Sequence, residues 1–392
     1  MQLERQRDNQ QWILDHFVKT AGRVQNFFDD GRALPAEVKS YAMIPRVLEK
    51  EAVHAEALAR AAAEAGHYRT ARDAYWVAAD TYREAQHAIF EDDNPLKMRL
   101  WAKVDACYDR IIEHSDYPIE RVEIPWQGVT LAALVHLLPD RRKAPFVIYV
   151  PGMDGTKENG IDPTNNIFHA RGFHVLALDG PGQGSSNLRK IRVTDDNYAS
   201  AGSAAIDYLL QRPELDAGKV VLFGSSMGTY WGSQIAATDP RVRGCATVRA
   251  CYGPKQHIFN QASPRFKQVF MYMAGIHDEG EFDRLAARMT LDAYAPRIRC
   301  PTLMVTGEFD PLCYLEETEA VYEAIPGPKE LWVFENEAHS LRGMKAIASL
   351  NVYAFMLDWL NDALAGRIGP GHQRRVLIPK AGVGVYTRSG EY

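Results

Sequence analysis

The stretch VVLFGSSMGTYWG, Val220–Gly232, joins a short apolar run to a serine that has a glycine on each side. Gly224 and Gly228 stand two positions before and two positions after Ser226, which gives the pattern G-x-S-x-G. A turn this sharp between a strand and a helix forces its central residue into strained backbone geometry, and only very small neighbours avoid clashes there. The stretch therefore predicts a buried strand, a tight turn that lifts the hydroxyl of Ser226 above the edge of a sheet, and a helix. Ser225 is the competing serine, but it occupies an x position and is expected to point elsewhere.

Further apolar runs follow the same plan along the second part of the chain. They are FVIYV at 146–150, HVLALD at 174–179, GCATV at 244–248, TLMVTG at 302–307 and LWVFEN at 331–336. Such runs, separated by helical stretches, indicate a parallel sheet that is covered on both faces. Before them, RVEIPWQGVTLAALVHLL has a turn signal at Gln127-Gly128 and predicts a β-hairpin. A last helix is expected over 340–366, and the tail after it contains a possible short strand, RVLIP.

The first 115 or so residues have a helical pattern and almost no strand signal. Ile13, Phe17 and Val24 fall at helical spacings, and two further helices are expected over 49–66 and 68–90. The tract EDDNP at 91–95 interrupts this pattern before another helix through Trp101. The segment AEAGHYRTARDAY resembles one tetratricopeptide unit, but a repeat array needs about three copies, so a helical bundle is the preferred interpretation.

The composition excludes several classes of partner. The chain has 392 residues and a net charge of −5, which argues against nucleic acid or an anionic membrane as the partner. Five cysteines without a CxxC pair fit reduced thiols, no metal site is indicated, and no cofactor is expected. The charged N-terminus lacks the apolar core of a signal peptide, and no run approaches the roughly 18 apolar residues that span a bilayer. A cytoplasmic location is therefore expected.

A reactive serine needs a base, and the base needs an acid that orients it. In this architecture the acid and the histidine follow the serine in that order. Asp310 comes directly after the run TLMVTG, and His339 comes just past the last predicted strand of this series. Both therefore fall at the carboxyl ends of strands, on the same edge as Ser226. Glu308 is the rival acid, and His372 in the tail is the rival histidine.

Backbone N–H groups must stabilise the negative oxygen that forms during such a reaction. One is expected from Met227, the residue after the serine. The other is expected from the loop PGMDGTKENG after the strand FVIYV, from the amide of Met153 or of Asp154. The turn DGPGQGSS at 179–186 fits neither a dinucleotide fingerprint nor a P-loop and is interpreted as structural.

Together the motifs PGMDGTKE, DGPGQG, GSSMG, GEFDP and NEAH resemble those of the α/β-hydrolase superfamily over residues 118–366. Within it, the helical N-terminal third resembles a narrower group that includes 2,6-dihydroxypseudooxynicotine hydrolase, related esterases and fungal hydrolases that shorten polyketides. The resemblance implies an α/β-hydrolase fold: a mostly parallel sheet with helices on both faces, an all-α N-terminal domain and a lid insertion. The expected division is a helical domain at 1–117, a catalytic domain at 118–366 with a lid-like insert at 252–298, and a tail at 367–392.

The resemblance also implies a serine-dependent hydrolase of an ester or of a carbon–carbon bond beside a ketone. It implies an auxiliary acid in the loop after the third strand, where the candidates are Asp154 and Glu158. It further implies that the helical domain covers the cleft and supports a homodimer. An aromatic-rich insert near the same edge suggests a bulky apolar or aromatic small molecule as the substrate. The predicted pocket residues are Tyr230, Trp231, Tyr252, Phe266 and Phe270.

Three alternatives remain open. A plain carboxylesterase or lactonase would use the same residues on a simpler substrate. A peptidase is disfavoured, because the N-terminal part predicts helices and not the four-strand repeats of a propeller. A tetratricopeptide-like scaffold on a degenerate hydrolase is the alternative of another class, and the complete set of Ser226, Asp310 and His339 argues against it.

Overall fold

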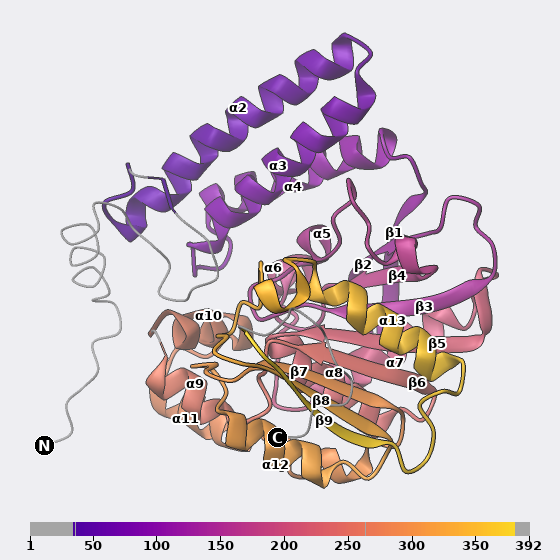
Figure 1. Cartoon of the computed structure of the whole chain (residues 1–392). Helices are drawn as coiled ribbons and strands as arrows, with labels where there is room; N and C mark the ends of the chain where they lie inside the picture. Colours follow the sequence, from indigo (N-terminus) through magenta and orange to yellow (C-terminus); the bar gives the residue numbers. More distant parts are fainter. Residues whose placement is uncertain (1–33, 36, 263, 381–392) are drawn as a thin grey trace, which may run out of the picture.

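A nine-stranded sheet forms the centre of the computed structural model, which describes residues 34, 35, 37–262 and 264–380 (Figure 1). Its spatial order is β1-β2-β4-β3-β5-β6-β7-β8-β9. The pairs β1/β2 and β2/β4 are antiparallel, and all other neighbours are parallel. The strands are β1 (Ile119–Trp126), β2 (Val129–His136), β3 (Ala144–Val150), β4 (His174–Leu178), β5 (Leu215–Ser225), β6 (Val242–Val248), β7 (Thr302–Gly307), β8 (Lys329–Phe334) and β9 (Gln373–Ile378).

Helices cover both faces of this sheet and one of its ends (Figure 1). The α-helices are α2 (Ile44–Glu64), α3 (Tyr68–His87), α4 (Pro95–Glu113), α5 (Lys157–Gly160), α6 (Gly184–Leu188), α7 (Asn197–Leu209), α8 (Met227–Thr238), α9 (Lys255–Gln261), α10 (Pro264–Ala274), α11 (Glu279–Arg288), α12 (Leu315–Ala324) and α13 (Val352–Leu364). Short 3₁₀ helices are η1 (Tyr41–Met43), η2 (His169–Arg171), η3 (Ala295–Arg297) and η4 (Lys345–Ile347). The predicted fold class, a mostly parallel α/β sheet with a helical N-terminal part, is confirmed.

The alternation of side chains along β5 shows why its apolar run is continuous. Val220 and Leu222 point into the core that includes α7 and α8, whereas Val221 and Phe223 point into the core beneath α13. All four side chains are completely buried. A strand that is covered on both faces has no solvent-facing positions, so it lacks the polar–apolar alternation of a half-exposed strand.

Local signals explain the boundaries of several elements. Gln127 and Gly128 have φ values of 48° and 81°, as the tight hairpin turn between β1 and β2 requires. In the tract EDDNP, the side chain of Asn94 accepts hydrogen bonds from the backbone of Leu96 and Lys97, and Pro95 is the first residue of α4. The interruption in the helical pattern is therefore an N-cap followed by a proline that needs no hydrogen-bond partner.

The expected helix over 340–366 is wrong in its first half. The chain forms turns and η4 up to Asn351, whose side chain caps α13. Leu341, Ala348 and Ser349 have φ values between 47° and 58°, and this left-handed conformation cannot continue a right-handed helix. The short strand expected at RVLIP is found as β9, which ends at Ile378 and pairs in parallel with β8.

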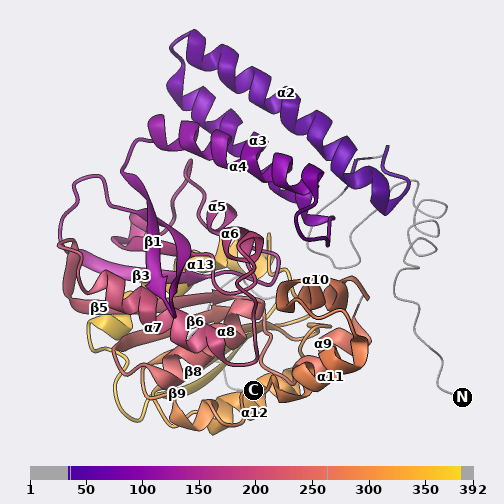
Figure 2. The same cartoon turned by 180° about the vertical axis from the view of Figure 1, so that it is seen from behind.

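The three long N-terminal helices pack together and lie on the side of the sheet where α5 and α6 are found (Figures 1 and 2). Their apolar core contains Tyr75 and Tyr82 of α3 and Val104 and Tyr108 of α4, and it reaches Leu134 of β2. The predicted helical spacing of Ile13, Phe17 and Val24 lies outside the described residues. In the part of the chain that the structure describes, no helix has the length and hydropathy needed to cross a bilayer.

Candidate active site

Ser226 lies between the last residue of β5 and the first residue of α8, with φ 56° and ψ −122°. This is a strained conformation for a residue with a side chain, and it is held by the hydrogen bond from the Ser226 amide to the carbonyl of Val248 at 2.9 Å. A side chain at Gly228 would overlap the carbonyl oxygen of Val150, and one at Gly224 would overlap that of Gly228. Both glycines are thus required by close backbone contacts around the serine.

The structure brings the three predicted residues into one hydrogen-bonded chain. Nε2 of His339 lies 3.0 Å from Oγ of Ser226, and Nδ1 of His339 lies 2.7 Å from Oδ2 of Asp310. The other oxygen of Asp310 accepts the backbone N–H of Leu312 at 2.9 Å, and the carboxylate is completely buried. A carboxylate on Nδ1 fixes that nitrogen as the N–H donor and leaves Nε2 able to accept the proton of a hydroxyl.

The rival residues make other contacts. Oγ of Ser225 accepts a hydrogen bond from the hydroxyl of Tyr353 at 3.3 Å. Oε2 of Glu308 accepts the backbone N–H of Asn336 at 2.8 Å. His372 pairs with Glu330 at 2.8 Å. None of the three rivals enters the hydrogen-bonded chain of Ser226.

The loop after β3 lies directly against the serine, as the predicted position of the second oxyanion amide requires. A Cβ atom at Gly152 would lie 3.2 Å from Cβ of Ser226. Met153 follows in the same loop and is buried, and Met227 is the first residue of α8. The two predicted amide donors therefore come from different segments next to Ser226, one from the loop after β3 and one from the start of α8.

Gln183, in the turn after β4, fixes this loop, and Tyr198 of α7 holds Gln183. Nε2 of Gln183 donates a hydrogen bond of 2.7 Å to the carbonyl of Gly152. Oε1 of Gln183 in turn accepts the hydroxyl of Tyr198 at 2.5 Å. Both Gln183 and Tyr198 are buried. The turn DGPGQGSS, interpreted from sequence as structural, thus supports the loop through its glutamine.

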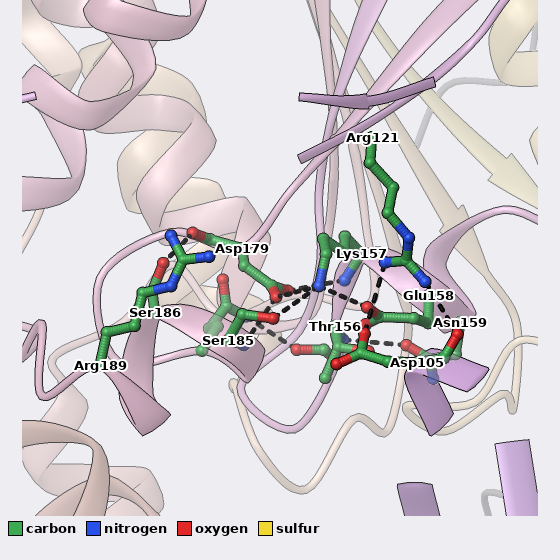
Figure 3. Close-up of polar contacts among 12 residues, drawn as sticks. Asp105, Arg121, Thr156, Lys157, Glu158, Asn159, Asp179, Ser185, Ser186 and Arg189 are labelled. Carbon is green, nitrogen blue, oxygen red and sulfur yellow. Dashed lines mark hydrogen bonds and ion pairs between the residues drawn. The ribbon is translucent and has the colours of Figure 1, made fainter. Parts of the chain in front are cut away.

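A buried ionic cluster, defined here as Lys157, Glu158, Asp179 and Ser185, anchors the far end of the same loop (Figure 3). Nζ of Lys157 donates to Oδ2 of Asp179 at 3.0 Å and to Oγ of Ser185 at 2.7 Å, and it forms an ion pair with Glu158. Asp179 also accepts the backbone N–H groups of Lys157 at 2.7 Å and of Ser185 at 2.8 Å. The cluster joins the ends of β3 and β4 below the helical region.

The charges in this cluster depend on one another. Burial opposes the charge on Lys157, but Asp179 and Glu158 outweigh it, so the pKa of Lys157 is raised. Burial likewise opposes the charge on Glu158, but the ammonium of Lys157 outweighs it and lowers the pKa of Glu158. Burial raises the pKa of Asp179 despite the same ammonium. The lysine is therefore charged at neutral pH and holds at least one carboxylate in its ionised form.

A cavity of about 730 Å³ opens beside Ser226 and His339. The edge of the sheet supplies Tyr149, the 151–155 loop and Arg249. Helices α2 and α3 cover it with Leu48, Trp76 and His87 among others, and α10 adds Arg265, Phe266 and Val269. The helical region and the insert after β6 therefore both form walls of the cavity. Arg83 of α3 links the two parts, because its guanidinium donates to the carbonyl of Asp154 at 3.3 Å.

The two candidate auxiliary acids occupy different places. Asp154 is one of the residues that line the cavity. Glu158 belongs to the buried ionic cluster with Lys157 and does not line that cavity. Of the two, only Asp154 is placed where it can meet a substrate.

Only one of the five predicted pocket residues lines the cavity, and it is Phe266. Tyr230 and Trp231 lie on α8, which is buried on all sides, and Trp231 stacks on Tyr198 with ring centroids 4.4 Å apart. The Tyr252 hydroxyl contacts Thr247, and Phe270 packs against the rings of Phe259 and Phe282. The prediction is wrong for these four, because their side chains pack in the core beneath the edge of the sheet and do not extend to the cavity.

Sequence reasoning missed Gln183, the ionic cluster and the arginines of the cavity. The motif DGTKE gave little signal for the cluster, because lysine and glutamate side chains are rarely buried unless they are paired. Nothing local marks Asp179 as its partner, since the pairing depends on how β3 and β4 lie side by side. Among the described residues, no group of three or more His, Cys, Asp or Glu side chains is arranged to hold a metal ion.

Comparisons with known proteins found several hydrolases that are similar to this chain. An α/β-hydrolase of Xenoacremonium sinensis, xenA, is 30% identical over 254 residues, which are 61% of this chain and 58% of that protein. The 2,6-dihydropseudooxynicotine hydrolase of Paenarthrobacter nicotinovorans is 26% identical over 287 residues, 71% of this chain and 74% of that protein. The chain therefore spans somewhat more than half the length of the first of these relatives.

A crystal structure of 2,6-dihydroxy-pseudo-oxynicotine hydrolase matches the fold with a TM-score of 0.74 and 22% identity, over 93% of this chain and 98% of that chain. Residues 161–367, more than half of the sequence, match the model of the prolyl oligopeptidase family. That segment contains β4 to β8 and the residues Ser226, Asp310 and His339. The chain is therefore a serine hydrolase with the α/β-hydrolase fold, and it belongs to the prolyl oligopeptidase family.

Proposed function

We propose that Ser226 attacks the carbonyl of a bulky small molecule and that the scissile bond is a carbon–carbon bond beside a ketone or an ester. The observation that carries this proposal is the chain of hydrogen bonds from Asp310 through His339 to Ser226, beside a cavity of about 730 Å³. This volume is within the range of about 300–1,000 Å³ in which small-molecule sites fall.

In the first step, Nε2 of His339 takes the proton of Ser226 while Oγ bonds to the carbonyl carbon. Asp310 keeps the imidazole in place and stabilises it when it is charged. The amides of Met227 and Met153 stabilise the negative oxygen, and one such donor is worth about 3–4 kcal/mol in the transition state. Because these donors are held by the backbone, they need no reorganisation during the reaction.

In the second step, the bond to the leaving group breaks and His339 returns the proton to it. An ester releases an alcohol, whereas a 1,3-diketone releases an enolate that is protonated at carbon. Water, deprotonated by His339, then attacks the acyl group on Ser226 and releases the acid. Asp154 lines the cavity, so its carboxyl group is the candidate for assisting proton transfer to an enolate.

The wall of the cavity supports a bulky substrate with an apolar part. Leu48, Trp76, Phe266, Val269 and Leu312 provide apolar surface from four separate segments. Among similar proteins, one is named a 2,6-dihydropseudooxynicotine hydrolase and another a 20-hydroxy-prefusarin hydrolase. We propose a ketone or ester of comparable size for this chain.

A peptide or amide bond is the second candidate, because the family match is to the prolyl oligopeptidases. The match begins at residue 161, so it does not include α2 and α3, which cover the cavity. An aminoacyl nitroanilide, offered beside an ester with the same acyl group, tests this alternative directly.

The deciding experiment is a search for an acyl adduct on Ser226 by mass spectrometry, after incubation with β-diketones and with esters of the same acyl group. Labelling by a fluorophosphonate is expected in the wild type and in Ser225→Ala, and is expected to be absent in Ser226→Ala. A folded wild-type protein that neither labels nor forms an adduct would refute the proposal. An adduct from esters but never from diketones would reduce the function to that of a carboxylesterase or lactonase.

A further inference from the structure

Arg249 lies next to the reactive serine on the neighbouring strand. Val248, the last residue of β6, pairs in register with Ser225 of β5, so Arg249 follows β6 at the level where Ser226 follows β5. Arg249 has a φ of 61°, which is uncommon for a residue other than glycine. Such strained residues cluster at sites where a side chain must be placed for function.

The side chain of Arg249 is oriented toward the site. Its Nε donates a hydrogen bond of 3.1 Å to the carbonyl of Ser340, the residue after His339. Arg249, Ser226 and His339 all line the same cavity, and the arginine side chain is half-buried. The contact with Ser340 uses one of the five N–H donors of the guanidinium and leaves its terminal nitrogens for another partner.

Within the described ranges, no carboxylate forms an ion pair with Arg249, in contrast to Arg83 of the same cavity. Arg83 pairs with Asp80 and with Glu84. The charges of these two, out of the four acids that line the cavity, are therefore compensated by Arg83. A charged guanidinium that is half-buried beside a reactive group, without an acid of its own, is suited to bind an anion from outside.

The charge of Arg249 also acts on its surroundings. Burial alone would raise the pKa of Tyr353, but Arg249 together with the contact to Ser225 holds it below its usual value. Tyr353 donates to the hydroxyl of Ser225, directly before the nucleophile in sequence. Arg249 therefore lies close enough to Tyr353, the partner of Ser225, to act on it electrostatically.

We propose that Arg249 binds a carboxylate of the substrate, so that the compounds hydrolysed at Ser226 are carbonyl compounds that carry an acid group a few bonds from the reacting carbon. This inference rests on the proposed function of Ser226. A planar guanidinium matches a carboxylate with two parallel hydrogen bonds, so Arg249 determines specificity and fixes the orientation of the substrate.

The test uses two pairs of aryl esters in which a carboxylate is replaced by a carboxamide. One pair has this group on the acyl side of the ester, and the other has it on the alcohol side. For the wild type, kcat/KM is expected to be higher for the carboxylate in at least one pair. In Arg249→Met, the carboxylate-to-carboxamide ratio is expected to fall by about tenfold to a hundredfold, the effect of losing a hydrogen-bonded charge partner.

Arg243→Met is the matched control, because Arg243 is an exposed arginine on β6, the strand that Arg249 follows, and does not line the cavity. Inhibition of the wild type by benzoate and by benzamide gives a readout that does not depend on turnover, and benzoate is expected to bind more tightly. Arg249→Lys keeps the positive charge but cannot form two parallel hydrogen bonds with a carboxylate, so it is expected to retain only part of this preference. If Arg249→Met does not fold, the wild type and the lysine variant still decide the question.

Equal rates within both pairs, or a preference that survives in Arg249→Met, would overturn the inference. Fluorophosphonate labelling separates this outcome from a failure of the proposed function. A wild type that labels at Ser226 without any preference for acids refutes the role of Arg249 alone. A folded wild type that does not label refutes the proposed function itself.

Discussion

Gln183 holds the carbonyl of Gly152 at 2.7 Å, and this one hydrogen bond sets the direction of the next amide. The carbonyl of Gly152 and the N–H of Met153 belong to the same planar trans peptide, so they point in opposite directions. Because Gly152 packs against Ser226, fixing its carbonyl toward Gln183 fixes the Met153 amide relative to the serine. A side chain from the β4 turn thus prepares the predicted oxyanion donor.

Gln183→Leu is therefore expected to lower kcat with little change in KM, since the oxyanion exists only after the serine has attacked. Loss of one such donor costs about 10²–10³ in rate when it is removed outright, and a misdirected amide is expected to cost somewhat less, about tenfold to a hundredfold. Steady-state kinetics with a nitrophenyl ester measures kcat and KM separately. Gln211→Leu, on the exposed surface, is the control. A variant with normal kcat and a raised KM would contradict this role.

The buried ionic cluster predicts a large loss of stability in Lys157→Met. Removing the ammonium leaves Asp179 and Glu158 buried without their counter-charge, and breaking a buried pair in this way costs about 3–5 kcal/mol. The free energy of unfolding in urea measures the loss. Adding Asp179→Asn and Glu158→Gln to the same chain removes the uncompensated charges and is expected to restore part of the stability. An unchanged midpoint in Lys157→Met would show that the cluster does not hold the fold.

The positions of the three reactive residues along the chain were predictable, because each depends on where a strand ends. Ser226, Asp310 and His339 each follow an apolar run, and the carboxyl ends of parallel strands meet at one edge. Their hydrogen-bonded geometry follows from that topology. The turn at Gln127-Gly128 and the sheet itself were predictable for the same reason, since backbone preference and burial act locally.

The walls of the cavity were not predictable in the same way. Tyr230 and Trp231 follow the serine closely, but the whole segment Met227–Ala236 is buried and has no free face. The helix has no charged residue and is rich in small and apolar ones, which is typical of a core helix, and this pattern was the available signal. Arg249 and Gln183 act through neighbours on other strands, so a single local pattern cannot identify them.

Asp310→Asn tests the assignment of the orienting acid. An amide at this position is expected to stabilise the wrong tautomer of His339, and an exchange of this kind lowers kcat by about 10⁴. The nitrophenyl ester assay is expected to show this loss while fluorescence reports a folded protein. Glu308→Gln is the matched control, because Glu308 accepts a hydrogen bond from the backbone of Asn336 and lies outside the hydrogen-bonded chain of Ser226. A larger loss in Glu308→Gln than in Asp310→Asn would reverse the assignment.

His136 gives a prediction for the dependence of stability on pH. It is the last residue of β2, it is completely buried, and its Nδ1 lies 3.1 Å from the hydroxyl of Tyr117. Burial, with a smaller contribution from His169, lowers the pKa of His136 to about 3. The unfolded chain has a histidine pKa near 6.5, so between about pH 6.5 and pH 3 the unfolded state binds the proton and the folded state does not.

Stability is consequently expected to fall as the pH drops below about 6.5, and this histidine alone accounts for about 2 kcal/mol of the loss at pH 5. His136→Asn removes the titrating group, so the difference in unfolding free energy between pH 7 and pH 5 is expected to shrink by about that amount, whatever the absolute stability of the variant. His54→Asn, at an exposed position of α2, is the control and is expected to keep the wild-type difference. Because the comparison is made within each variant, a cavity or a lost contact at position 136 cancels from it. An unchanged difference in His136→Asn would mean that this imidazole does not remain neutral in the folded protein.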